Sequence, residues 1–152
     1  MRVRELMTAH PLTVGADDPI TRAARLMLEN RYGGLPVVDG QGRLAGVLEV
    51  DDLLPHPELI PHSDVEALKL FEDWIDPGDY AEIFRRYEGT PVRAVMRPEP
   101  PTLNPDDRLW HALKTLVENQ FRRVPVVDAD GRVVGILTRS DFLRLFLSQE
   151  EG

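Results

Sequence analysis

The sequence of 152 residues contains no cysteine, which excludes disulfide frameworks, thiolate zinc sites and cysteine nucleophiles together. It also lacks any uninterrupted apolar run near the ~18 residues that a membrane span needs. The first ten residues show no apolar core of a secretory signal. We therefore expect a soluble protein that stays in the cytoplasm and does not bind membranes.

Basic side chains are outnumbered: 18 lysines and arginines stand against 26 aspartates and glutamates, which leaves a formal charge of −8. This balance argues against a nucleic-acid-binding protein, because such binding depends on neutralising phosphates with a basic face. The hydrophobic fraction of 42% is ordinary for a globular chain, so we expect a folded core in place of disorder. The length suits one compact domain.

An internal repeat organises the chain. Residues 3–54 return as residues 92–143 at a constant shift of 89 positions, with 20 identities in 52 pairs and no gap. Chance does not produce such a match, so the two copies share one fold. Neither copy, at roughly 50 residues, buries enough surface to be stable alone. We therefore expect the two copies to pack face to face about a pseudo-twofold axis.

Each copy predicts the element order β-α-β-β-α, and thus an α/β (α+β) fold. The helix of the first copy follows Asp17, Asp18 and Pro19; aspartate caps free amide groups, and proline suits the first helical position. Apolar residues at helical spacing then predict one buried face on each first helix. They are Ile20, Ala23, Ala24, Met27 and Leu28 in the first copy, and Leu109, Ala112, Leu113, Leu116 and Val117 in the second.

These features divide the chain into a first motif at residues 1–54, an acidic helical insert at 55–91, a second motif at 92–147 and a C-terminal tail at 148–152. The insert holds 3 basic and 9 acidic side chains and so carries −6 of the total charge. Its apolar residues fall at helical spacing. Two interpretations stay open for it: a helical connector with a solvated acidic face, or a docking surface.

Residues 39–45, Asp-Gly-Gln-Gly-Arg-Leu-Ala, match the dinucleotide-binding pattern G-x-G-x-x-A and follow a predicted strand, as that motif requires. A second β run comes next, so the helix N-terminus that would bind pyrophosphate is missing. We interpret the segment as the turn of a β-hairpin, which residues 128–131 form in the second copy.

Metal binding and catalysis have little support. His56, Glu58 and His62 are separated by prolines and form no helical pair, so we expect no metal site. No G-x-S-x-G elbow is present, and His10 and His111 occupy unequal repeat positions. We therefore expect that the protein is not an enzyme and needs no cofactor.

Residues 135–141, Gly-Ile-Leu-Thr-Arg-Ser-Asp, place a hydroxyl (Thr138), a cation (Arg139) and a carboxylate (Asp141) at one strand-to-helix turn. Such a carboxylate accepts both hydroxyls of a ribose, while threonine and a helix N-terminus receive phosphate oxygens. A second interpretation stays open, in which Asp141 only caps its helix.

Three patterns in the two copies resemble the CBS domain, named for cystathionine β-synthase. They are h-P-V-V-D at 35–39 and 124–128, G-x-h-h-G at 42–46 and 131–135, and G-h-h-T-x-x-D at 135–141, where h is an apolar residue. The resemblance covers both copies and excludes the insert. It implies a tandem CBS pair, or Bateman module, whose inter-repeat clefts bind adenine nucleotides or related adenosyl compounds. Such modules commonly dimerise into a flat disc.

The resemblance also implies which residues line the clefts, since each cleft takes its T-x-x-D from one repeat and its base-contacting segment from the other. The first cleft then combines Thr138, Arg139 and Asp141 with Thr13, Gly33, Gly34 and Leu35. The second combines Glu49 and Asp52 with Thr102, Arg122, Arg123 and Val124.

The second cleft departs from the family pattern, because Glu49 stands where threonine is usual. A carboxylate ~4 Å from a phosphate costs ~1 kcal/mol under full water screening and ~4 kcal/mol at an effective dielectric of 20. Arg122 or Arg123 is available to neutralise Glu49. We therefore predict two unequal clefts, of which the second binds more weakly.

From these observations we expect a stand-alone regulatory module that binds AMP, ADP, ATP or a related adenosyl ligand, forms a homodimer and signals to a protein partner. The alternative is a ligand-free protein–protein interaction scaffold, in which Asp141 is merely a helix cap.

Overall fold

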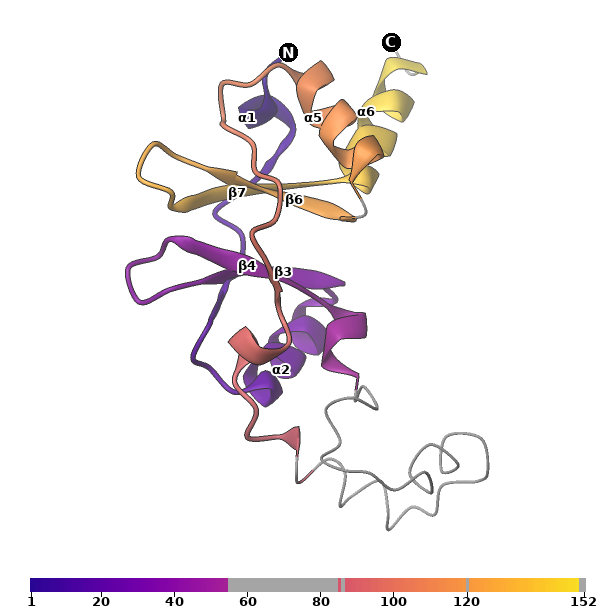
Figure 1. The fold of residues 1–152 in the computed structure, drawn as a ribbon. Helices are drawn as coiled ribbons and strands as arrows, with labels where there is room; N and C mark the ends of the chain where they lie inside the picture. Colours follow the sequence, from indigo (N-terminus) through magenta and orange to yellow (C-terminus); the bar gives the residue numbers. More distant parts are fainter. Residues whose placement is uncertain (55–84, 86, 120, 151–152) are drawn as a thin grey trace.

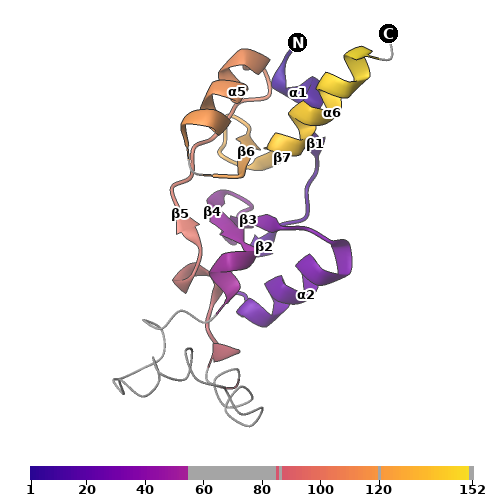
Figure 2. The ribbon, with the colours of Figure 1, turned by 90° about the vertical axis from the view of Figure 1, so that its right-hand side faces the viewer.

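The computed structural model describes residues 1–54, 85, 87–119 and 121–150. Two small β-sheets are stacked face to face at the centre of this part of the chain, with helices on their outer sides (Figures 1 and 2). Both ends of the chain lie beside the second repeat (Figure 1). This mixed arrangement confirms the expected fold class.

The two repeats build corresponding elements. The first repeat forms β2 (Val14–Gly15), α2 (Ile20–Asn30), β3 (Gly34–Val38), β4 (Leu44–Glu49) and the 3-10 helix η1 (Val50–Leu53). The second forms α5 (Leu109–Glu118), β6 (Arg123–Val127), β7 (Val133–Thr138) and α6 (Arg139–Glu150). In place of a β2 equivalent, Leu103 makes a single parallel bridge to Val126.

The segments that lead into the two repeats are exchanged. The first contains α1 (Val3–Leu6) and β1 (Thr8–Ala9), and β1 pairs antiparallel with β7 of the second repeat. The second contains the 3-10 helix η3 (Val92–Ala94) and β5 (Arg97–Pro98), and β5 pairs with β4 of the first repeat. Each leading segment therefore completes the sheet of the other repeat, giving the strand orders β2-β3-β4-β5 and β1-β7-β6. The sequence repeat alone does not predict this exchange.

The contacts between repeats obey the same 89-residue shift as the sequence. The backbone N–H of Val3 donates to the carbonyl of Asp107 at 3.0 Å, and that of Val92 donates to the carbonyl of Asp18 at 2.8 Å. Near the axis itself, Arg43 forms a β-bridge with its own equivalent. The predicted face-to-face packing about a pseudo-twofold axis is therefore confirmed.

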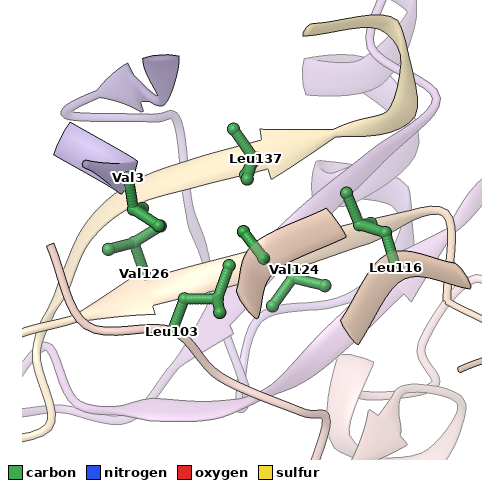
Figure 3. Packing of buried hydrophobic residues seen from close by; sticks show 7 residues of the cluster. Val3, Leu103, Leu116, Val124, Val126 and Leu137 are labelled. Carbon is green, nitrogen blue, oxygen red and sulfur yellow. The ribbon is translucent and has the colours of Figure 1, made fainter. Parts of the chain in front are cut away.

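Each sheet has its own hydrophobic core, and each core receives a valine from the exchanged segment. Figure 3 shows fully buried Val3 packed among second-repeat residues. That cluster consists of Val3, Leu103, Ala112, Leu116, Val124, Val126 and Leu137. Val92 is equally buried in the cluster of the first repeat. The exchange thus ties the two repeats together through buried apolar surface, the main stabilising term in folding.

The predicted helix caps are wrong in detail. The carboxylate of Asp18 accepts a hydrogen bond from the N–H of Gly15 at 2.9 Å, so it closes the preceding turn and does not cap α2. Pro19 occupies the N-cap position, one residue earlier than predicted. The first amide of α2, at Ile20, donates instead to the carbonyl of Thr90 in the exchanged segment, at 2.9 Å. A backbone carbonyl just before the second repeat therefore does the work expected of a local side chain.

The predicted buried faces of the helices are right except at one end. Ile20, Ala23 and Met27 are buried in the first repeat, but Leu28 and its equivalent Val117 are exposed. Both lie near the C-terminal ends of their helices, so they fall at the edge of the packed face.

The predicted hairpin turn is confirmed, because β4 follows it directly. Gly42 and its equivalent Gly131 have φ angles of +78° and +79°, a conformation that glycine adopts without strain. The dinucleotide-binding interpretation of residues 39–45 therefore stays excluded. The expected helices of the insert and the residues His56, Glu58 and His62 lie outside the described residues. In the part of the chain that the structure describes, no helix is long and apolar enough to cross a membrane.

The exchange predicts that a core mutation in a leading segment weakens the opposite repeat. Val3→Ala should lower the free energy of unfolding by about 2 kcal/mol, because it leaves a cavity in a packed core. Hydrogen exchange should then speed up first in β6 and β7. Val92→Ala is the matched variant and should speed exchange first in β3 and β4. The exchange would be disproved as a stabilising device if each variant loosened its own repeat.

Candidate functional site

The two candidate sites lie where the central hairpins run into helices, at the end of the sheets opposite the hairpin turns (Figure 1). We call them the Thr138 site, at the junction of β7 and α6, and the Glu49 site, at the junction of β4 and η1. The pseudo-twofold axis relates them, since Thr138 corresponds to Glu49 and Asp141 corresponds to Asp52. Differences between the sites therefore come from the side chains.

At the Thr138 site, Asp141 holds the first turn of α6. One carboxylate oxygen, Oδ2, accepts hydrogen bonds from the N–H of Thr138 at 2.7 Å and from its hydroxyl at 3.0 Å. Asp141 is only 6% exposed. The capping interpretation is thus correct as far as Oδ2 is concerned.

The second oxygen of Asp141 has a different kind of partner. Oδ1 accepts a hydrogen bond at 2.8 Å from Arg144, which lies three residues along the same helix. The side chain of Arg144 is 73% exposed, so water competes for it and little free energy holds it in place. An exposed arginine is therefore the only described group that covers Oδ1. Arg144 was absent from the sequence-based site, although its position one turn after Asp141 was the available signal.

Arg139 belongs to the turn but extends toward a neighbouring helix. Its guanidinium donates to the carbonyl of Leu116, near the C-terminal end of α5, at 3.2 Å. This bond satisfies a helix-end carbonyl and links α5 to α6. In this geometry Arg139 positions the two helices of the second repeat.

At the Glu49 site, two side chains from different repeats form a buried ion pair. Nε of Arg123 lies 2.9 Å from Oε1 of Glu49, and the two side chains are 14% and 4% exposed. Arg123 also reaches the carbonyl of Gly34, at 3.5 Å. Of the two arginines proposed to neutralise Glu49, Arg123 does so, whereas Arg122 is exposed and lies 4.0 Å from Asp51.

Asp52 is held more firmly than its equivalent Asp141. Its Oδ2 accepts from the N–H of Glu49 at 2.8 Å, and its Oδ1 lies 3.2 Å from Nε of Arg97 on the exchanged strand β5. The hydroxyl of Tyr87 donates to the backbone carbonyl of Asp52 at 3.2 Å. Burial, and then the charge of Asp52, raise the pKa of Tyr87, so its phenol stays protonated.

Arg97 and Tyr87 were not predicted for this site. The guanidinium of Arg97 lies 5.9 Å from the ring centre of Phe121, a cation–π distance that fixes it further. Arg97 stands where the first repeat has Thr8, so the comparison of repeats contained the signal. The exchange that brings β5 to Asp52 was needed to interpret it.

The remaining predicted residues take varied positions. Leu35 and Val124 are buried in the two cores, which leaves only their backbone for a ligand. Thr13 is half-buried and Thr102 is exposed, and neither hydroxyl is hydrogen-bonded within the described residues.

The sequence predicts that Gly33 and Gly34 line the same cleft as Thr138. Gly34 is the first residue of β3, and β3 contacts β7, the strand that ends at Thr138. Both glycines also lie against the guanidinium of Arg123, so they border the Glu49 site as well.

Among residues 1–54, 85, 87–119 and 121–150, no three histidine, aspartate or glutamate side chains are arranged to hold a metal ion. The chemistry available at the Thr138 site is therefore that of a hydroxyl, a carboxylate, arginine and the N-terminus of a 12-residue helix.

Known proteins are similar to this chain in sequence and architecture. CBS domain-containing protein CBSX2 of Arabidopsis thaliana, a chloroplastic protein, is 35% identical over 129 residues, covering 82% of this chain and 54% of that protein. An uncharacterised protein of Methanocaldococcus jannaschii is 28% identical over 155 residues, covering 97% and 92%. The chain thus spans about half the length of the chloroplast relative.

Solved structures agree. The crystal structure of CBSX2 in complex with AMP superposes with a TM-score of 0.72 at 31% identity, over 98% of both chains. The CBS domain of a membrane protein from Sphaerobacter thermophilus gives a TM-score of 0.75 at 31% identity, over 95% of this chain and 87% of that one. The sequence pattern of the CBS domain family matches residues 3–57 and 92–148. This chain therefore belongs to the CBS domain family and is a tandem CBS pair.

Proposed function

We propose that this CBS pair is a non-catalytic regulatory module that binds an adenine nucleotide or a related adenosyl ligand at the Thr138 site. The observation that carries the proposal is the state of Asp141: a buried carboxylate with one oxygen fixed by Thr138 at the end of β7 and the other covered by the exposed Arg144. A related structure that was crystallised with AMP supports the ligand class.

The binding step follows from that geometry. Ribose hydroxyls replace Arg144 at Oδ1 of Asp141, which costs little because the arginine is exposed and remains charged in water. The hydroxyl of Thr138 and the N-terminus of α6 then favour phosphate oxygens. The released guanidinium of Arg144 is proposed to neutralise part of the phosphate charge. Thr13, Gly33 and the backbone of Leu35 are the proposed contacts to the base.

The Glu49 site is proposed to bind the ligand more weakly. Its set consists of Glu49, Asp52, Thr102, Arg122, Arg123 and Val124. The carboxylate of Asp52 has both oxygens bonded to packed groups, so a ribose competes against a half-buried arginine in place of an exposed one. The charge of Glu49 is neutralised by Arg123, so this site does not attract a positively charged adenosyl compound either.

We test the site assignment with Asp141→Asn against its matched control Asp52→Asn. Asparagine keeps the capping geometry, so both variants should fold. Asp141→Asn should weaken AMP binding tenfold or more in isothermal calorimetry, because a charge-assisted hydrogen bond is worth roughly 1.5–3 kcal/mol. Asp52→Asn should change the affinity of the Thr138 site for AMP less than twofold. Equal affinity in wild type and Asp141→Asn would remove the assignment.

The alternative function, a ligand-free scaffold, is separated by thermal unfolding with AMP, ADP, ATP and S-adenosylmethionine. A ligand at 100 times its Kd stabilises the native state by about 2.7 kcal/mol. For a chain of this size that free energy raises Tm by roughly 5–11 °C. No shift with any of the four compounds would favour the scaffold.

The proposed module acts as a homodimer that signals to a protein partner. Five large hydrophobic residues are exposed on the two helices that cover the second sheet: Trp110, Val117, Leu143, Phe146 and Leu147. Such exposure is typical of interaction surfaces. Because CBSX2 is chloroplastic, a cytoplasmic location stays a prediction.

The dimer is tested by light scattering after chromatography. Phe146→Glu combined with Leu147→Glu should halve the mass in solution, since buried unpaired charge opposes association. Leu28→Glu, at an exposed position on α2, is the control and should leave the mass unchanged. A monomeric wild type, or a double variant that stays dimeric, would contradict this interface.

A further inference from the structure

The residues at the Thr138 site that correspond to Glu49 and Arg123 are small. The 89-residue shift maps Arg123 onto Gly34 and Glu49 onto Thr138. The contact from Arg123 to Glu49 therefore corresponds to an approach of Gly34 to Thr138, and β3 and β7 do contact each other. One site holds a guanidinium and a carboxylate where the other holds a glycine hydrogen and a small hydroxyl.

The pair depends on Gly34 as well. A Cβ on Gly34 would lie 2.6 Å from Nε of Arg123 and 2.6 Å from the carbonyl oxygen of Leu48. Any larger residue there would push the arginine away from Glu49, because the Leu48 oxygen belongs to the backbone and cannot yield. Gly34, which the sequence assigns to the Thr138 site, thus makes space for the Arg123 side chain at the Glu49 site.

Burial makes the pair costly to displace. Glu49 is only 3% exposed, and its ionised carboxylate depends on Arg123 for compensation. A nucleotide phosphate that displaced the arginine would face an unpaired carboxylate. At ~4 Å and an effective dielectric of 20, that repulsion lowers affinity roughly a thousandfold.

We infer that Glu49 and Arg123 occupy the second nucleotide position themselves, and that they weaken binding there so far that the wild type takes up one adenine nucleotide per chain in calorimetry. The inference rests on the proposed function, because it assumes that the Thr138 site binds AMP. On this inference, residues 49 and 123 determine how many AMP molecules one chain binds. Replacing them with the corresponding residues of the first site, threonine and glycine, should open the second site.

The experiment converts the second site into a copy of the first. Glu49→Thr combined with Arg123→Gly should bind two AMP molecules per chain in calorimetry, where the wild type binds one. Adding Asp52→Asn to that double variant should weaken the second binding event tenfold or more, as Asp141→Asn does at the first site. Glu49→Ser with Arg123→Ala serves as a second version that keeps a better strand-forming residue at position 123.

The single variants give a readout without ligand. Glu49→Thr or Arg123→Gly alone leaves one buried charge unpaired and should lower Tm by roughly 10 °C. Each double variant should recover most of that loss, and melting curves with and without AMP show that it is folded.

The outcomes separate the inference from the proposed function. Two AMP molecules on the wild type, or one on both folded double variants, would overturn the inference while the Thr138 site stands. A wild type that binds no AMP overturns the proposed function and the inference with it. One AMP on the wild type and two on a double variant supports both.

Discussion

The exchange of the two leading segments is the constraint on which the rest of the structure depends. Without residues 1–9 the second sheet lacks β1 and its core lacks Val3; without residues 90–98 the first sheet lacks β5 and its core lacks Val92. Each half is therefore completed by the other. The face-to-face packing of the sheets follows from this, and with it the approach of β3 to β7 that brings residues of both halves to the same places.

The Thr138 site and the Glu49 site have the same backbone geometry but different side-chain partners. The carboxylates of Asp52 and Asp141 make the same hydrogen bond to the first residue of their turns, at 2.8 and 2.7 Å. The difference lies in the second oxygen: a solvent-exposed arginine covers it in one case, and an arginine from a packed strand in the other. A few side-chain differences between the repeats thus leave one carboxylate paired with an exposed arginine and the other with a half-buried one.

Much of this was predictable from the sequence, because a repeat constrains the fold at every position. The hairpin turns, the helices and the buried residues were predicted from apolar spacing and glycine, and the pairing of Glu49 with Arg122 or Arg123 from charge alone. The exchanged segments were not, since a two-residue strand has no periodicity to show its partner. Arg97 and Tyr87 were missed for the same reason: they meet Asp52 only after the chain has folded, and local spacing carries no such information. Arg144 lies three residues after Asp141, so local spacing did contain the signal for it.

The swapped strands also set when this protein becomes native during synthesis. Thr8 pairs with Ile136 and Val47 pairs with Arg97, so each pairing waits until its residue in the second repeat has been synthesised. Contacts so distant in sequence cost loop entropy before they contribute stability, and contacts of this kind slow folding in general. A nascent chain that stops after its first half presents the bare edge of β4 to other chains, and such an edge invites aggregation. Each repeat is therefore protected from edge-to-edge aggregation only when the other repeat is present.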